Sequence, residues 1–193
     1  MSEGWAVTPC HVIREGHESD IEQCVALTLV AAPERSPSDW CDSIARDIEN
    51  REHHLVVVER RGEIIGYGRA RLFEPEPQAL ADTAPRGYYL TGVFVAPNER
   101  RAGIGAALTQ ARLNWISDRA ADAWYFANAR NAASIALHER FGFEEVTRHF
   151  SFPGLTFDGG EGILFRLSFA RRGNRKDSQS PRGDIGILLE NDP

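Results

Sequence analysis

The most informative part of this chain reads Val93-Phe94-Val95-Ala96-Pro97-Asn98-Glu99-Arg100-Arg101-Ala102-Gly103-Ile104-Gly105-Ala106-Ala107-Leu108. The apolar run at its start predicts a strand, which ends at Pro97 because proline has no N–H to pair. Gly103 and Gly105 can adopt positive φ and let the backbone approach a ligand closely. The first N–H groups of the helix that follows have no partner within the helix, and the helix dipole favours an anion there. This order of elements therefore predicts a phosphate-binding turn.

The glycine pair alone does not identify the ligand. No Gly-Lys-Ser/Thr follows, so it is not a P-loop, and Leu108 stands where a dinucleotide fingerprint needs its third glycine. An ordinary strand-to-helix turn that uses glycines remains the alternative at this point.

The composition excludes several classes of protein. The 193 residues suit one domain, and the net charge of −6 argues against a nucleic-acid partner, which needs a basic face. Cys10, Cys24 and Cys41 are odd in number and form neither a metal-ligand spacing nor a disulfide framework, so we expect no metal and a reducing compartment. The start of the chain does not resemble a signal peptide, and no apolar run approaches the ~20 residues of a membrane span. We therefore expect a cytoplasmic protein without a membrane partner.

Periodicity predicts a mixed α/β domain without an internal boundary. We take residues 1–10 as an N-terminal extension, 11–169 as the domain, and 170–193 as a polar tail that is solvated or disordered. The predicted order is strand, two helices, three strands, helix, strand, helix, two strands. The strands fall at 11–14, 54–60, 64–73, 87–95, 123–128, 144–149 and 162–169, and the helices begin near residues 18–19, 36–38, 105 and 131–134.

Two motifs in this order make the chain resemble the GNAT superfamily of acyl-CoA N-acyltransferases over about residues 11–169. The segment Arg100-Arg101-Ala102-Gly103-Ile104-Gly105 matches the family's pyrophosphate loop, Arg/Gln-x-x-Gly-x-Gly/Ala. The segment from Asn131 to Phe141-Gly142-Phe143 matches the family's second feature, an Asn followed by a short helix that ends in an aromatic-Gly-Phe step. The resemblance implies an N-acetyltransferase domain with a mixed, mostly antiparallel sheet of six to seven strands and about four helices.

The resemblance also implies that acetyl coenzyme A is the donor substrate. Backbone N–H groups of residues 101–106 would hold its pyrophosphate, and Arg100 and Arg101 would add charge-assisted donors unless they are only solvated. The pantetheine arm would pair with the strand backbone as an added strand does. Asn131 and Ser134 would contact the cofactor, although both are also good helix caps. The implied cofactor-binding residues are Val93, Phe94, Val95, Arg100, Arg101, Ala102, Gly103, Ile104, Gly105, Ala106, Asn131 and Ser134, with the side chains of Val93 and Val95 expected in the core.

His138 occupies the position where many family members carry a tyrosine that is thought to protonate the departing thiolate. Histidine can do this near neutral pH, and some branches, including phosphinothricin-type acetyltransferases, also show Leu-His-Glu here. We therefore name His138 as a candidate general acid, with a packed, singly bonded histidine as the alternative. The general base is unknown: the strand offers Tyr88, Tyr89 and Thr91 instead of a carboxylate. Candidates by loop position alone are Glu74, Glu76, Asp82, His53, His54 and Asp158.

The loop from Phe150 to Glu161 has two interpretations. Its three phenylalanines, at positions 150, 152 and 157, could form an apolar wall of the acceptor site, with Asp158 and Glu161 facing a cation. Alternatively, the loop packs on the sheet or on a second copy of the chain in a homodimer, which we slightly prefer.

The predicted function is direct transfer of an acetyl group from acetyl coenzyme A to a primary amine of a small molecule, because no cysteine lies in a motif typical of an acyl-enzyme. The alternatives are a non-catalytic acyl-coenzyme A binding or regulatory module, and an acetyltransferase that acts on protein amines.

Overall fold

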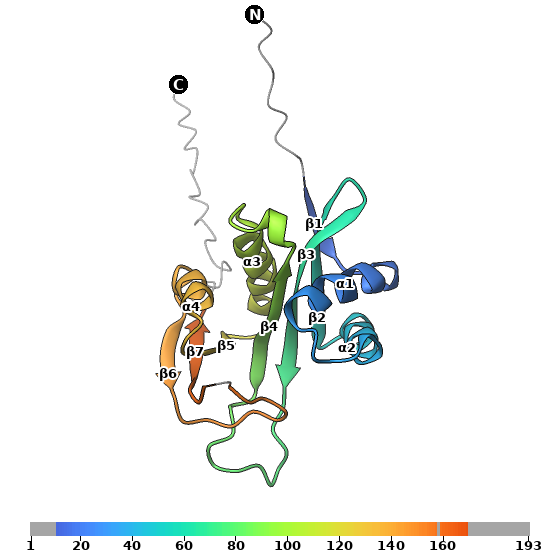
Figure 1. The fold of residues 1–193 in the computed structure, drawn as a ribbon. Coiled ribbons are helices and arrows are strands. Elements are labelled where there is room, and N and C mark those ends of the chain that lie inside the picture. Colours follow the sequence, from blue (N-terminus) through green and yellow to red (C-terminus); the bar gives the residue numbers. More distant parts are fainter. Residues whose placement is uncertain (1–10, 158, 170–193) are drawn as a thin grey trace, which may run out of the picture.

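The computed structural model describes residues 11–157 and 159–169, so the predictions for the N-terminal extension, the polar tail and Asp158 lie outside the described residues. Figure 1 shows a central sheet with helices on both faces. The strands are β1 (Val12–Glu15), β2 (His53–Arg60), β3 (Glu63–Phe73), β4 (Gly87–Val95), β5 (Asp122–Asn128), β6 (Glu144–Thr147) and β7 (Gly162–Ser168). The helices are α1 (Ile21–Ala31), α2 (Pro37–Glu49), α3 (Ile104–Ser117) and α4 (Ala132–Glu139), with short 3₁₀ turns η1 (Glu18–Asp20) and η2 (Pro97–Glu99).

The strands form one seven-stranded sheet in the order β1-β2-β3-β4-β5-β7-β6. The single parallel contact in this sheet joins β4 to β5, and the other neighbours are antiparallel. The predicted mixed, mostly antiparallel sheet with four helices is thus confirmed.

Hydrophobic clusters lie on both faces of the sheet. On one face α1 and α2 pack on β2 and β3 around Trp40, Ile44 and Tyr67. On the other face α3 and α4 cover the middle strands, and Leu113 and Ile116 of α3 meet Leu90 of β4. Figure 1 shows α1 and α2 together beside β2 and β3, with α3 behind β4.

Local sequence signals explain where α2 begins but not where α1 begins. Ser36 caps α2, as predicted, because its hydroxyl accepts a 3.2 Å hydrogen bond from the N–H of Asp39. The predicted cap of the first helix at residues 18–19 is wrong: these residues form η1, and α1 starts at Ile21. The Asp20 carboxylate accepts the His17 N–H at 2.8 Å and pairs with Arg14 at 2.7 Å, so the acid closes this turn before the helix begins.

A bulge in β4 shapes the middle of the sheet. Gly68 of β3 pairs with Val93 and Arg69 with Thr91, so Gly92 is an extra residue, and its φ of 64° lies in the region that favours glycine. β4 pairs with β5 only from Tyr88 to Leu90. Beyond that point β4 stays with β3 while β5 stays with β7, and the two strands diverge (Figure 1).

Candidate functional site

Where β4 and β5 diverge, two connected cavities lie between them and α4. The outer cavity, of about 520 Å³, opens at the start of α3, and the inner cavity, of about 380 Å³, lies deeper between the strands. Both are lined by Val93, Asn131 and Ser134, so they form one groove. Most of the residues that the sequence predicts to bind a cofactor line its outer part.

The outer cavity ends at the N-terminus of α3. Arg101 and Gly103 have φ values of 65° and 82°, which turn the chain sharply before the helix. The first backbone bond of the helix runs from the N–H of Ala107 to the carbonyl of Gly103, at 3.0 Å. The N–H groups of residues 104–106 thus precede the helix's own bonding pattern and are available to an anion.

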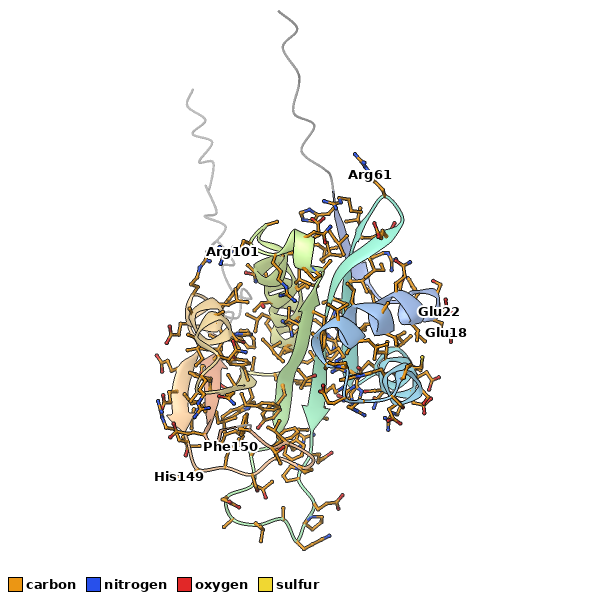
Figure 2. The ribbon with its side chains drawn as sticks, in the orientation of Figure 1. Glu18, Glu22, Arg61, Arg101, His149 and Phe150 are labelled. Atoms are coloured by element: carbon orange, nitrogen blue, oxygen red, sulfur yellow. The ribbon has the colours of Figure 1, made fainter. Side chains whose placement is uncertain are left out.

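The two arginines of the turn behave differently. The Nε of Arg100 donates to the carbonyl of Val95 at 3.4 Å, which ties the turn to the end of β4. Arg101 is exposed and extends on the side of the turn that faces α4 (Figure 2). Glu99 also lines the cavity, but Arg60 neutralises it in an ion pair. The positive charge of Arg101 is therefore available to a ligand.

Val93, Phe94 and Val95 of β4 line the outer cavity and also contact the hydrophobic clusters of the sheet. Val93 and Val95 pack against Ile104 and Leu108 of α3. Phe94 points to the opposite face and stacks on Tyr67, with ring centroids 5.0 Å apart. This placement agrees with the predicted core role of both valine side chains. Among the described residues, the β4 edge that faces β5 has no strand partner from residue 91 to 95.

Asn131 and Ser134 act as helix caps while lining both cavities. The Asn131 side chain accepts the N–H of Ser134 at 3.1 Å, so it is the N-cap of α4. The Ser134 hydroxyl accepts a 2.6 Å hydrogen bond from the Tyr125 hydroxyl, which leaves its own proton free to be donated. The cap role and the predicted ligand role are therefore compatible.

His138 is buried beside the inner cavity, with 3% of its surface exposed. Its ring stacks on Tyr125 with centroids 3.7 Å apart. Its Nδ1 lies 2.8 Å from the carbonyl of Ser134, and a carbonyl only accepts, so Nδ1 carries the proton. Burial lowers the pKa of His138 to about 4. The neutral ring thus offers a lone pair at Nε2, which has no hydrogen-bond partner among the described residues.

Two buried arginines on the inner cavity are absent from the sequence prediction. Arg69 of β3 and Arg112 of α3 have 7% and 0% of their surfaces exposed. Arg112 follows Leu108 by four residues and so lies on the same apolar face of α3. An arginine within that apolar face is the only sequence signal that could have indicated its burial. Arg69 lies in a strand that is buried on both faces, so its direction could not be inferred from alternation.

The candidate bases that the structure describes lie away from the groove. His53 has its Nδ1 3.1 Å from Asp47, and His54 stacks on Trp115 on the α3 face. Glu74 pairs with Arg86, and Asp82 accepts the Ser151 hydroxyl. Glu76 lines a different cavity, together with Glu74. None of these side chains lines the groove, so the general base stays unassigned.

The phenylalanines of the β6–β7 loop pack on the sheet. Phe152 lies 4.3 Å from Phe73 and 4.9 Å from Phe126 between ring centroids, and Phe157 lies 5.8 Å from Phe150. Figure 2 shows Phe150 where this loop crosses the end of the sheet. The preferred interpretation of a loop that packs on the sheet agrees with this arrangement, and Phe126 also forms one wall of the inner cavity.

Two kinds of feature are absent from the described residues. Within 11–157 and 159–169, no group of three or more metal-ligating side chains has a geometry that could hold a metal ion. In the same ranges, no helix combines the length and the apolar character needed to cross a membrane.

Comparison with known proteins points to one family. The model of the acetyltransferase (GNAT) family matches residues 20–143. An N-alpha-acetyltransferase from Sulfurisphaera tokodaii is 28% identical over 149 residues, which are 74% of this chain and 86% of that protein. A mycothiol acetyltransferase from Amycolatopsis mediterranei is 31% identical over 51% of this chain, which spans only 31% of that longer protein. The ribosomal-protein-S18-alanine N-acetyltransferase from Escherichia coli has the same fold, with a TM-score of 0.64 at 20% identity over 87% of this chain and 99% of that one.

Proposed function

Because the chain belongs to the GNAT family of acetyltransferases, we propose that it transfers an acetyl group from acetyl coenzyme A directly to a primary amine of a small molecule. The main support for this donor is the groove between β4 and β5, which runs from the N-terminus of α3 to the inner cavity. Acetyl coenzyme A is the donor typical of the family. The two described cysteines, Cys24 and Cys41, are free thiols, which supports a cytoplasmic reaction.

Successive parts of the groove suit successive parts of this donor. The pyrophosphate meets the N–H groups of residues 104–106 and the free charge of Arg101. The amide-containing pantetheine arm pairs with the unpartnered edge of β4 from residue 91 to 95. The thioester then reaches the inner cavity, whose volume of about 380 Å³ suits an acyl group with a small acceptor.

The reaction needs one bond to form and one to break. The amine nitrogen attacks the thioester carbon, the carbon–nitrogen bond forms, and the carbon–sulfur bond breaks. Coenzyme A leaves as a thiolate and takes up one proton, while the new amide loses one. A free thiol titrates near ~8.5, so this thiolate needs only a weak acid.

The proton donor that the geometry favours is the Tyr125 hydroxyl acting through Ser134: the Ser134 hydroxyl gives its proton to the thiolate as it takes the Tyr125 proton across their 2.6 Å hydrogen bond. The His138 assignment as general acid remains a prediction. A ring whose pKa lies near 4 carries no proton at Nε2 at neutral pH, so we propose that this atom accepts a hydrogen bond from the donor or the acceptor.

A second candidate is acetylation of a protein N-terminal amine. One relative, whose match covers 74% of this chain, is named an N-alpha-acetyltransferase. An α-amine titrates near ~8, so more of it is neutral at pH 7 than of an alkyl amine near ~10.4, and it depends less on a general base.

Release of free thiol from acetyl coenzyme A, measured across a panel of small amines and N-terminal peptides, tests both candidates. Small amines alone should give turnover under the main proposal, and peptides alone would replace it with the second candidate. Thermal stabilisation by acetyl coenzyme A without turnover on any amine would favour a non-catalytic binding module. A folded protein that saturating acetyl coenzyme A does not stabilise would contradict the donor assignment.

A further inference from the structure

The inner cavity is lined by two guanidinium groups that reach it from opposite faces of the sheet. Arg112 rises from α3, and its guanidinium lies under Gly68, where an added Cβ would be 2.9 Å from Nε. Arg69 lies on the face of α1 and α2, and its Nε is 3.3 Å from the position that a Cβ on Gly92 would take. The opening between β4 and β5 thus exposes one cavity to both positive charges.

Among the described residues, the hydrogen bonds of Arg112 all go to neutral partners. It donates to the carbonyls of Leu108 and Arg69, both at 3.1 Å, and to the hydroxyl of Thr109 at 3.2 Å. Burial lowers its pKa to about 9, so the group is still charged at neutral pH. A buried charge without an opposite charge is costly, and an anion in the cavity would offset that cost.

The carboxylate nearest Arg69, that of Asp47, also contacts other groups. The Nη1 of Arg69 lies 3.6 Å from Asp47, whose carboxylate is already bonded by Arg71 at 2.5 and 2.7 Å, and the Nδ1 of His53 lies 3.1 Å away. Arg35 and Arg69 both lie over the Trp40 ring, and the charge of Arg35 acts against that of Arg69. The Nε of Arg69 has no hydrogen-bond partner among the described residues. The Asp47 carboxylate is therefore shared by Arg69 and Arg71, and one donor of Arg69 remains unused beside the cavity.

The rest of the cavity wall supplies no negative charge. Among the described residues that line it, there is no aspartate or glutamate. Two more of its buried polar atoms, Thr91 Oγ1 and His138 Nε2, also lack partners within the described part of the chain. Unpartnered buried polar atoms are rare in folded proteins, and here three of them line the same cavity.

From this cluster we infer that the acceptor is a compact primary amine that also carries a carboxylate, which Arg69 binds in the inner cavity. The inference rests on the proposed function and narrows its acceptor. The two guanidinium groups also lower the pKa of an ammonium beside them by repulsion, so the neutral amine forms without a carboxylate base. A polyamine or other multiply charged cation would be repelled from the same cavity.

The test compares amino acids with their amides as acceptors in thiol release, because the two share a carbon skeleton and only the acid carries the carboxylate; a pH high enough to deprotonate both amines removes the difference in their amine pKa values. We expect the wild-type kcat/KM to be higher for the acids by roughly 10- to 100-fold, the usual effect of a hydrogen bond to a charged group. Arg69→Gln should remove this preference through KM, with kcat changed much less. Arg71→Gln is the matched control: it also loses a bond to Asp47, but its side chain does not line the cavity, so the preference should persist.

Binding separates failure of the inference from failure of the proposed function. Amino acids should raise the melting temperature of the wild-type protein saturated with coenzyme A, whereas their amides should not. Arg69→Lys keeps the positive charge but lacks the planar guanidinium, and it replaces Arg69→Gln as the test variant if that protein does not fold. Equal or better turnover of amides and diamines, or a preference that survives in both Arg69 variants, would overturn the inference while the acetyltransferase stands. Absence of turnover on every amine, together with no stabilisation by acetyl coenzyme A, would instead remove the proposed function.

Discussion

The protonation state of His138 can be tested through the pH dependence of stability. The ring has an ordinary pKa of about 6.5 when unfolded, and burial lowers it to about 4 in the folded protein. The unfolded chain therefore binds a proton that the folded chain does not bind until the pH is much lower. The contribution of the neutral ring is complete above about pH 6.5 and is lost as the pH falls toward about 4.

The size of this effect follows from the two pKa values. At ~1.4 kcal/mol per pKa unit, the full effect is roughly 3 kcal/mol, of which about 2 kcal/mol appears between about pH 7.5 and pH 5. His138→Phe keeps an aromatic ring to stack on Tyr125 but cannot titrate, and it loses the bond to the Ser134 carbonyl. It should be less stable by about 1 kcal/mol at neutral pH and lose less stability on acidification.

Urea denaturation of both proteins at about pH 7.5 and pH 5 measures the difference. The wild-type protein should lose about 2 kcal/mol more unfolding free energy between these pH values than His138→Phe does. His149→Gln removes an exposed imidazole and should keep the wild-type difference. If the wild-type protein and His138→Phe lost equal amounts of unfolding free energy, burial would not hold the folded ring neutral. His138 would then again be a candidate proton donor.

Three further substitutions probe the groove and its supports. Gly105→Leu adds a side chain at the mouth of the outer cavity, where even a Cβ lies 3.6 Å from Leu137. Thermal stabilisation by acetyl coenzyme A should disappear while the circular dichroism spectrum is unchanged, and normal stabilisation would show that this turn is not part of the donor site. Gly68→Ala places a Cβ 2.9 Å from the fixed guanidinium of Arg112, so unfolding free energy in urea should fall by ~1–3 kcal/mol, and an unchanged value would show that the arginine moves freely. Ser36→Ala should cost ~1 kcal/mol by loss of the α2 cap without changing acetyl coenzyme A binding, and weaker binding would contradict the separation of α2 from the donor site.

The sequence predicted those features that depend on neighbouring residues. Alternation and glycine turns located the strands, Ser36 located the start of α2, and the turn at Gly103 located the start of α3, where the groove opens. Each of these features is set within a few residues of the chain. The family resemblance implied a mixed, mostly antiparallel sheet, but the strand order and the parallel β4–β5 contact were not predicted, since local patterns do not specify which strands become neighbours.

The inner cavity could not be predicted because its chemistry is assembled across the sheet. Arg112 is buried because Gly68, on a different strand, leaves room for its guanidinium. Arg69 faces the cavity because the bulge at Gly92 bends the adjacent strand. The pKa of His138 depends on its burial against Tyr125, which sequence spacing does not reveal. In each case a residue far along the chain decides the environment of the functional side chain.

The divergence of β4 from β5 also divides the chain into two halves. Strands β1 to β4 come from the first half and β5 to β7 from the second, and within the sheet the two sets meet through three residue pairs. The groove is thus a seam, and a molecule that fills it touches both halves. A ligand bound in the groove would then link the two halves of the sheet, and it would stabilise the whole fold by mass action to a degree set by its affinity and concentration. The proposed ligand site is also the place where, among the described residues, β4 has no strand partner on the side facing β5.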